Sequence, residues 1–209
     1  MKHWNRNIIA ALIGLLIISC TTSEDEAEKV ATGQLVLHTS SNQRTSESAD
    51  DYGVIIKNTE GETVLSFEKL SDAPESISLA VGEYQVQIFN QEEMPFITFD
   101  APYYYGENDF IIESGKTTDV SVTCTLKHML LTIVFDDKVK NDAKSYATEI
   151  HTAHDKVTID ASTSNKVYVE RSAIVLETTI EEMYGTILSS KQVLSGLEEK
   201  TEYTINISY

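Results

Sequence analysis

Hydrophobic and polar residues alternate along most of this chain. Tyr84, Val86 and Ile88 are separated by Gln85 and Gln87, so successive side chains would point to opposite faces of a strand. Turn residues separate the runs. The pattern predicts strands at 34–39, 53–57, 62–67, 76–81, 83–89, 109–113, 117–126, 166–170, 173–177, 186–190 and 202–209.

Helical periodicity is not sustained anywhere after the first twenty residues. Only 70–75 and 137–146 have room for a helical turn, and 148–150 with 156–159 read as the two arms of a hairpin. Short strands at regular spacing indicate an all-β fold of the sandwich type.

The parity of the apolar positions reverses within one continuous run. Even-numbered residues are apolar over 120–126, whereas odd-numbered residues are apolar over 129–135. A strand cannot change its buried face without a bulge, a break or a move to a second core. We therefore expect a crossover after Lys127 that joins two small β-sandwich domains, at 32–127 and 128–209.

The first twenty residues have the three parts of a secretory signal. Lys2 and Arg6 precede an apolar run at 8–18, which is shorter than the ~20 apolar residues of a membrane span. The ending Ile17-Ile18-Ser19-Cys20 resembles a bacterial lipobox. That resemblance implies a lipoprotein signal peptide at 1–19 and a lipid with acyl chains such as palmitate on Cys20. An ordinary signal with a cysteine at its boundary is the alternative.

An acidic segment follows, and we predict that 20–31 is a tether. Acidic residues directly after a lipidated cysteine resemble the signal that exports lipoproteins of the Bacteroides group to the exterior of the outer membrane. A solvated spacer explains the same residues. The formal net charge of −17 argues against a nucleic-acid partner and against binding to anionic headgroups. The lipid on Cys20 would then be the membrane contact.

Cysteine use fits this interpretation. The chain has two cysteines, so acylation of Cys20 leaves Cys124 without a partner for a disulfide. Cys124 lies among alternating apolar residues, and we expect it in the core as a small hydrophobic side chain.

One part of the chain resembles a known family. Pro102-Tyr103-Tyr104-Tyr105-Gly106, the turn Ser114-Gly115-Lys116 and the strand Val120–Leu126 closely resemble lipoproteins of the Bacteroides group that are classed as a domain of unknown function and are similar to fimbrillin-like proteins. The resemblance covers roughly 33–135. It implies transthyretin-like or fimbrillin-like β-sandwich domains of fimbrial subunits and their accessory proteins, and it supplies no catalytic motif.

Two features carry candidate sites. Tyr103, Tyr104 and Tyr105 either pack beside a turn or form an aromatic platform for sugar rings. Three adjacent side chains of a strand cannot all face one core, so at least one lies outside. Arg44 lies in a polar loop after the first strand. It is either a solvated residue or, as the fimbrillin-like resemblance implies, a site of proteolytic processing.

The other clusters of polar residues do not indicate a metal site or a catalytic site. His151, His154 and Asp155 form a compact group, but His151 and His154 would point to opposite faces of a strand. We expect no metal site, no cofactor and no catalytic residues.

The sequence therefore predicts a non-enzymatic cell-surface lipoprotein in adhesion or fimbrial assembly, as an anchor, accessory or tip protein. Its partners would be fimbrial subunits bound by strand pairing. The alternative is a surface lipoprotein that binds glycans for polysaccharide capture. A hydrolase ranks last.

Overall fold

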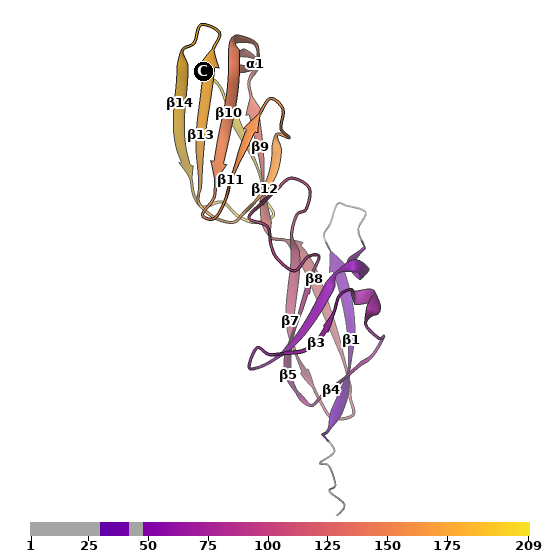
Figure 1. The fold of residues 1–209 in the computed structure, drawn as a ribbon. Helices are drawn as coiled ribbons and strands as arrows, with labels where there is room; N and C mark the ends of the chain where they lie inside the picture. The colour runs from indigo at the N-terminus through magenta and orange to yellow at the C-terminus, as the bar shows by residue number, and fades with distance from the viewer. Residues whose placement is uncertain (1–29, 42–47) are drawn as a thin grey trace, which may run out of the picture.

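The computed structural model describes residues 30–41 and 48–209, and strands are the main secondary structure of this part of the chain (Figure 1). The predicted all-β fold is confirmed. One α-helix, α1 (Asp137–Asp142), and two short 3-10 turns, η1 (Ala49–Asp51) and η2 (Leu70–Asp72), complete the described elements. No helix within the described residues is long and apolar enough to cross a membrane.

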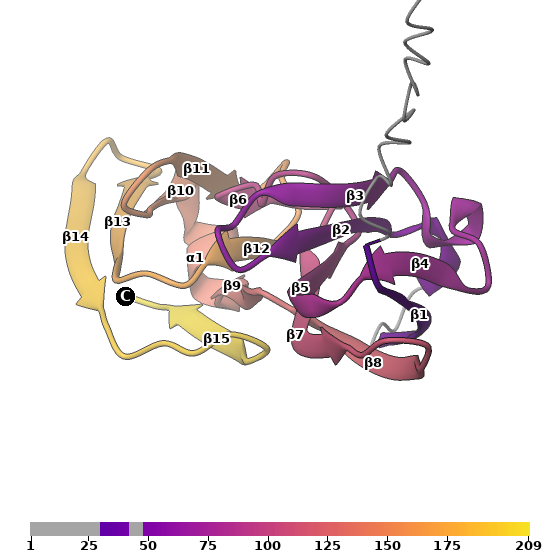
Figure 2. The ribbon, with the colours of Figure 1, turned by 90° about the horizontal axis from the view of Figure 1, so that it is seen from below.

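The N-terminal strand group is a seven-stranded sheet of order β3-β2-β5-β7-β8-β1-β4. Its members are β1 (Thr32–Ser41), β2 (Gly53–Asn58), β3 (Thr63–Phe67), β4 (Ile77–Ala80), β5 (Gly82–Phe89), β7 (Tyr104–Ile112) and β8 (Thr117–Leu126). The sheet curves round a common interior (Figure 2). The Sγ of buried Cys124 on β8 lies 3.6 Å from the carbonyl oxygen of Ile88 on β5, across that interior.

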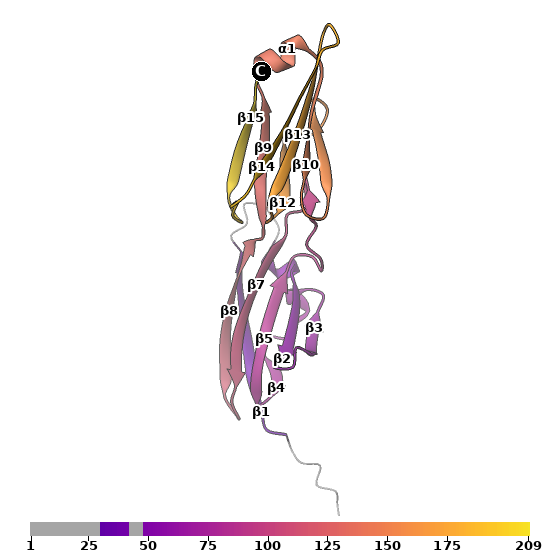
Figure 3. The same cartoon turned by 90° about the vertical axis from the view of Figure 1, so that its left-hand side faces the viewer.

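The C-terminal strand group contains two four-stranded sheets, β11-β10-β13-β14 and β15-β9-β12-β6. Its members are β6 (Ile97–Thr98), β9 (His128–Phe135), β10 (Ala143–His151), β11 (Lys156–Asp160), β12 (Lys166–Glu170), β13 (Ile174–Glu182), β14 (Ile187–Leu194) and β15 (Glu202–Ile207). Apolar side chains from both sheets form one buried cluster. The two strand groups lie end to end, so that the start of β1 and the C-terminus are at opposite ends of the molecule (Figure 3).

The parity reversal has a direct structural counterpart. Val120, Val122 and Cys124 of β8 are buried in the core of the N-terminal group, whereas Met129 and Leu131 of β9 are buried in the core of the C-terminal group. The chain thus passes from one core to the other between β8 and β9. These separate cores support the predicted division of the chain after Lys127, which stays a prediction.

One strand departs from that predicted division. β6 precedes Lys127 in sequence but pairs with β12 of the C-terminal group, with Ile97 opposite Val169 and Thr98 opposite Tyr168. Two residues are too short to give a periodic signal, so alternation could not predict this strand. The C-terminal group is therefore completed by a segment that the prediction assigned to the first domain.

The helical turns that the sequence allowed are present but short. Asp136 caps α1, since its Oδ1 accepts a hydrogen bond from the Val139 N–H at 2.7 Å. Val139 is the only buried residue of α1, so the helix has no apolar stripe that would extend it. The chain continues from Ala143 as β10, and only the end of this strand, at 148–150, has a pattern that predicts it.

Candidate functional site

The junction between the two strand groups is built around His128. This side chain is fully buried. Its Nδ1 accepts a hydrogen bond from the Tyr103 N–H at 3.0 Å, and its Nε2 lies 2.7 Å from the Pro95 carbonyl oxygen, to which it donates. These partners fix the neutral tautomer with the proton on Nε2. Burial lowers the pKa of His128 below its ordinary value, which keeps the ring neutral.

The three tyrosines beside this junction divide between two faces. Tyr104, the first residue of β7, is 7% exposed and belongs to the core of the N-terminal group. Tyr103 and Tyr105 are partly buried on the opposite face, with ring centroids 6.2 Å apart and an interplanar angle of 22°. The strand alternation that places two rings outside buries the third. Of the two alternatives drawn from the sequence, Tyr104 thus follows the packing one, and only Tyr103 and Tyr105 remain as candidates for a platform.

Polar and charged groups surround the outer tyrosine pair. The Tyr105 hydroxyl donates a hydrogen bond to Glu107, and the Lys127 ammonium lies 5.6 Å from the centroid of the Tyr105 ring. Lys127 also forms an ion pair with Glu199 at 3.8 Å. Burial raises the pKa of both Tyr103 and Tyr105, so their hydroxyls stay protonated. Lys127 and Glu199 were not predicted here, because Glu199 comes from the distant loop before β15.

Cys20 and Arg44 lie outside the described residues, so lipidation and processing stay predictions. Cys124 is fully buried and free, as expected. Burial raises its pKa to about 11, which leaves the thiol protonated and unreactive at neutral pH.

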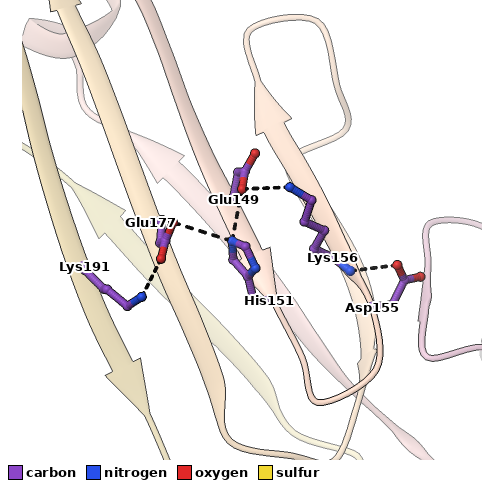
Figure 4. Close-up of polar contacts among 6 residues, drawn as sticks. All are labelled: Glu149, His151, Asp155, Lys156, Glu177 and Lys191. Carbon is purple, nitrogen blue, oxygen red and sulfur yellow. Dashed lines mark hydrogen bonds and ion pairs between the residues drawn. The ribbon is translucent and has the colours of Figure 1, made fainter.

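The structure does not bring His151 and His154 into one site. The His154 ring stacks on Phe96 at 4.4 Å between ring centroids, and its Nδ1 lies 2.9 Å from a carboxylate oxygen of Glu170. His151 instead faces two glutamates, one of which, Glu177, comes from β13 (Figure 4). Sequence spacing could not reveal Glu177 because only strand pairing places it beside β10.

Free strand edges and exposed apolar side chains gather at β14. This strand lies at the edge of its sheet, and Ile187 and Val193 on it are each 65% exposed. Met183 and Tyr184, in the turn before it, are exposed as well. β15, at the edge of the other sheet, pairs in parallel with β9 on one side only.

Known structures resemble this chain at low sequence identity. A fimbrial assembly protein from Parabacteroides distasonis aligns with a TM-score of 0.50 and 10% identity, over 84% of this chain and 90% of its own. A candidate cell adhesion protein from Bacteroides eggerthii aligns with a TM-score of 0.48 and 11% identity, over 84% of this chain and 86% of its own. A candidate adhesin from Bacteroides ovatus aligns with a TM-score of 0.46 and 11% identity, over 87% of this chain and 93% of its own. At 10% identity, the likeness to the fimbrial assembly protein concerns the fold alone.

Sequence comparison gives a family. No curated protein sequence matches this chain. A family model described as a domain of unknown function, DUF4493, matches residues 19–209 and confirms the resemblance drawn from the sequence. Since that match spans nearly the whole chain, the protein belongs to the DUF4493 family.

Proposed function

We propose that this chain is a non-enzymatic module of the bacterial surface that acts in adhesion or fimbrial assembly, as an anchor, tip or accessory protein. The observation that carries the proposal is the fold shared with the Parabacteroides fimbrial assembly protein over 84% of this chain and 90% of that one. Such a module acts by contact between surfaces and strand edges, and it needs no catalytic group.

The position of the start of β1 supports an anchored module. β1 begins at the end of the molecule opposite the C-terminus (Figure 3), and Cys20, the proposed point of lipid attachment, precedes β1 in the sequence. The N-terminal strand group would then face the outer membrane, and the C-terminal strand group would project away from it. The exposed edge strand β14 would thus be held where a partner can reach it.

The physical basis for a contact at β14 is its edge position and its apolar surface. An edge strand carries unpaired backbone N–H and C=O groups that can pair with a strand of another chain. Ile187, Val193 and the neighbouring Tyr184 are exposed apolar side chains that would be covered by such a partner.

Protease treatment of intact cells tests the location. We expect added protease to cleave the protein on intact cells, and mass spectrometry to find the Cys20 peptide lipidated. The state of Arg44 in the same spectra distinguishes an uncut anchor from a processed subunit. Protection on intact cells, with digestion only after lysis, would place the protein inside the envelope and overturn the proposal.

Charge substitutions on β14 test the contact surface. The double change Ile187→Lys and Val193→Lys should abolish co-fractionation with sheared surface fibres, because two charges would be desolvated in the interface. Val64→Lys is the matched control, since Val64 lies on edge strand β3 and is 42% exposed. Co-fractionation that survives the double change, or that Val64→Lys abolishes equally, would rule out β14 as the contact.

Glycan binding is a second candidate, and the paired rings of Tyr103 and Tyr105 favour it. Aromatic side chains on an outer face can stack on sugar rings. Tyr103→Ala and Tyr105→Ala should then abolish retention on polysaccharide and leave the circular dichroism spectrum unchanged. Retention that persists in both variants would exclude these rings as the platform.

A further inference from the structure

Three side chains with metal-binding groups converge on the outer face of β10 and β13 (Figure 4). Glu149 lies directly opposite Glu177 in the register of the antiparallel pair. His151 follows two residues after Glu149 on β10, so its side chain points to the same face. Like charges directly opposite each other destabilise a strand pair. A cation between the two glutamates would remove this repulsion.

The ligand atoms lie close to one another. His151 Nε2 is 3.0 Å from Glu149 Oε2 and 3.8 Å from Glu177 Oε2, and the ligand atoms of all three residues lie within 4.8 Å of one another. In a tetrahedral zinc site with bonds of 2.0–2.2 Å, ligand atoms are about 3.4 Å apart. The two distances from His151 Nε2 lie on either side of that value, each within about 0.4 Å of it.

The nitrogen of His151 has no competing hydrogen bond. Nε2 is shielded from solvent, and its geometry toward Glu149 does not satisfy a hydrogen bond despite the short distance. In the tautomer protonated on Nδ1, Nε2 carries a lone pair that no hydrogen bond occupies. A buried polar atom without a hydrogen bond costs free energy, and a metal bond would offset that cost.

Two lysines flank the cluster and act differently. Lys191 donates to Glu177 Oε1 at 2.6 Å, so it orients this carboxylate while Oε2 faces His151. Lys156 lies 3.4 Å from Glu149 Oε2, the same oxygen that faces His151. Lys156 therefore competes with a cation, but its exposed side chain can move into water.

We propose that Glu149, His151 and Glu177 form a binding site for a divalent transition-metal ion, with Zn²⁺ as the best fit. An imidazole with two carboxylates suits Zn²⁺, whereas Ca²⁺ and Mg²⁺ prefer oxygen ligands alone. Three protein ligands leave a fourth position for water. The ion joins β10 to β13 across the face of the sheet, and this role is independent of the function proposed above.

The His154 and Glu170 pair provides an internal comparison. It also places an imidazole nitrogen 2.9 Å from a carboxylate oxygen. It offers only two groups, however, and the His154 ring is held by its stack on Phe96. Selective binding at His151 rather than His154 therefore separates a three-ligand site from general attraction of cations to an acidic protein.

Calorimetric titration of the full chain with ZnCl₂ tests the proposal. We expect one Zn²⁺ per chain, and binding ~10-fold or more weaker in each of Glu149→Gln, His151→Gln and Glu177→Gln. His154→Gln should bind like the parent. Lys156→Met should bind more tightly, because the competing ammonium is gone. Circular dichroism checks that each variant is folded, and Glu177→Gln, at a half-buried position, remains informative if His151→Gln fails this check.

Cobalt substitution identifies the ligands. A Co²⁺ complex should show the d–d bands of a nitrogen and oxygen site, without a thiolate charge-transfer band from Cys20 or Cys124. A thiolate band would overturn the assignment. So would the absence of saturable Zn²⁺ binding, unchanged binding in the folded ligand variants, or an equal loss in His154→Gln.

Discussion

His128 uses both ring nitrogens inside the junction, and this makes its protonation costly. A second proton on Nδ1 would face the Tyr103 N–H, which now donates to that atom at 3.0 Å. The carboxylates of Glu170 and Glu199 favour the charged ring, but burial outweighs them and the pKa of His128 is lowered from 6.5. A single buried side chain thus links the stability of the junction to pH.

The pH dependence follows from this lowered pKa. Above about 6.5, His128 is neutral in both the folded and the unfolded chain, so its contribution to stability is fully present. As the pH falls below that value, the unfolded chain binds the proton first, and the free energy of unfolding should decrease until the folded pKa is passed. Urea unfolding of the parent between about pH 8 and pH 5 measures this decrease.

His128→Gln should remove this part of the pH dependence. It should also cost about 1–3 kcal/mol at neutral pH, since one of the two buried partners is left without a hydrogen bond. His38→Gln is the control, because His38 is exposed on β1. A pH dependence that is the same in the parent and in His128→Gln would contradict the assignment.

At the scale of elements, a buried hydroxyl pair joins β10 to β13 on the face opposite the proposed metal site. Thr148 and Thr178 lie directly opposite in the register, and their Oγ1 atoms are 2.9 Å apart. Both residues are buried. Each hydroxyl thus satisfies the other, and the pair behaves as one unit.

Removing one hydroxyl of the pair should lower the free energy of unfolding more than removing both. Thr148→Val leaves the Thr178 hydroxyl buried without its partner and should cost about 1–3 kcal/mol, whereas the double change with Thr178→Val should be nearly neutral. Urea unfolding of the two single variants and the double variant measures the coupling energy. Additive losses would show that the hydroxyl pair does not act as a unit.

At the scale of the whole molecule, the segment between β5 and β7 ties the two strand groups together. β6 pairs with β12, and the Glu170 N–H donates to the Phe96 carbonyl oxygen at 2.8 Å. Ile97 and Phe99 also pack against the core of the C-terminal strand group. A segment that lies between two strands of the N-terminal strand group therefore supplies part of the core and the edge of the C-terminal strand group.

Ile97→Ser should loosen the C-terminal strand group although it precedes the crossover in sequence. Burying a hydroxyl in place of an apolar side chain weakens the packing on β12. Hydrogen exchange measured by mass spectrometry should accelerate in β12 and β9 but stay unchanged in β2 and β5. Val64→Ser, on exposed β3, serves as the control. Acceleration confined to the segment around Ile97 would mean that the two groups are not coupled through it.

The sequence alone determined the features that depend on local alternation. The side-chain period of a strand is fixed by its backbone, so the runs at β5, β8 and β15 could be recognised without any partner. The same rule revealed the change of core between β8 and β9 and the burial of Cys124. The lipidation at Cys20 and the processing at Arg44 rest on the sequence and stay predictions.

Only the tertiary structure decided which distant residues meet. Glu177 lies opposite Glu149 because of the pairing register, and β6 joins β12 because the segment before β7 reaches across the junction. Neither arrangement leaves a periodic signal, since pairing between strands depends on contacts far apart in the chain. Alternation determines on which face of the sheet a side chain lies, whereas the register of neighbouring strands determines which residues lie beside it.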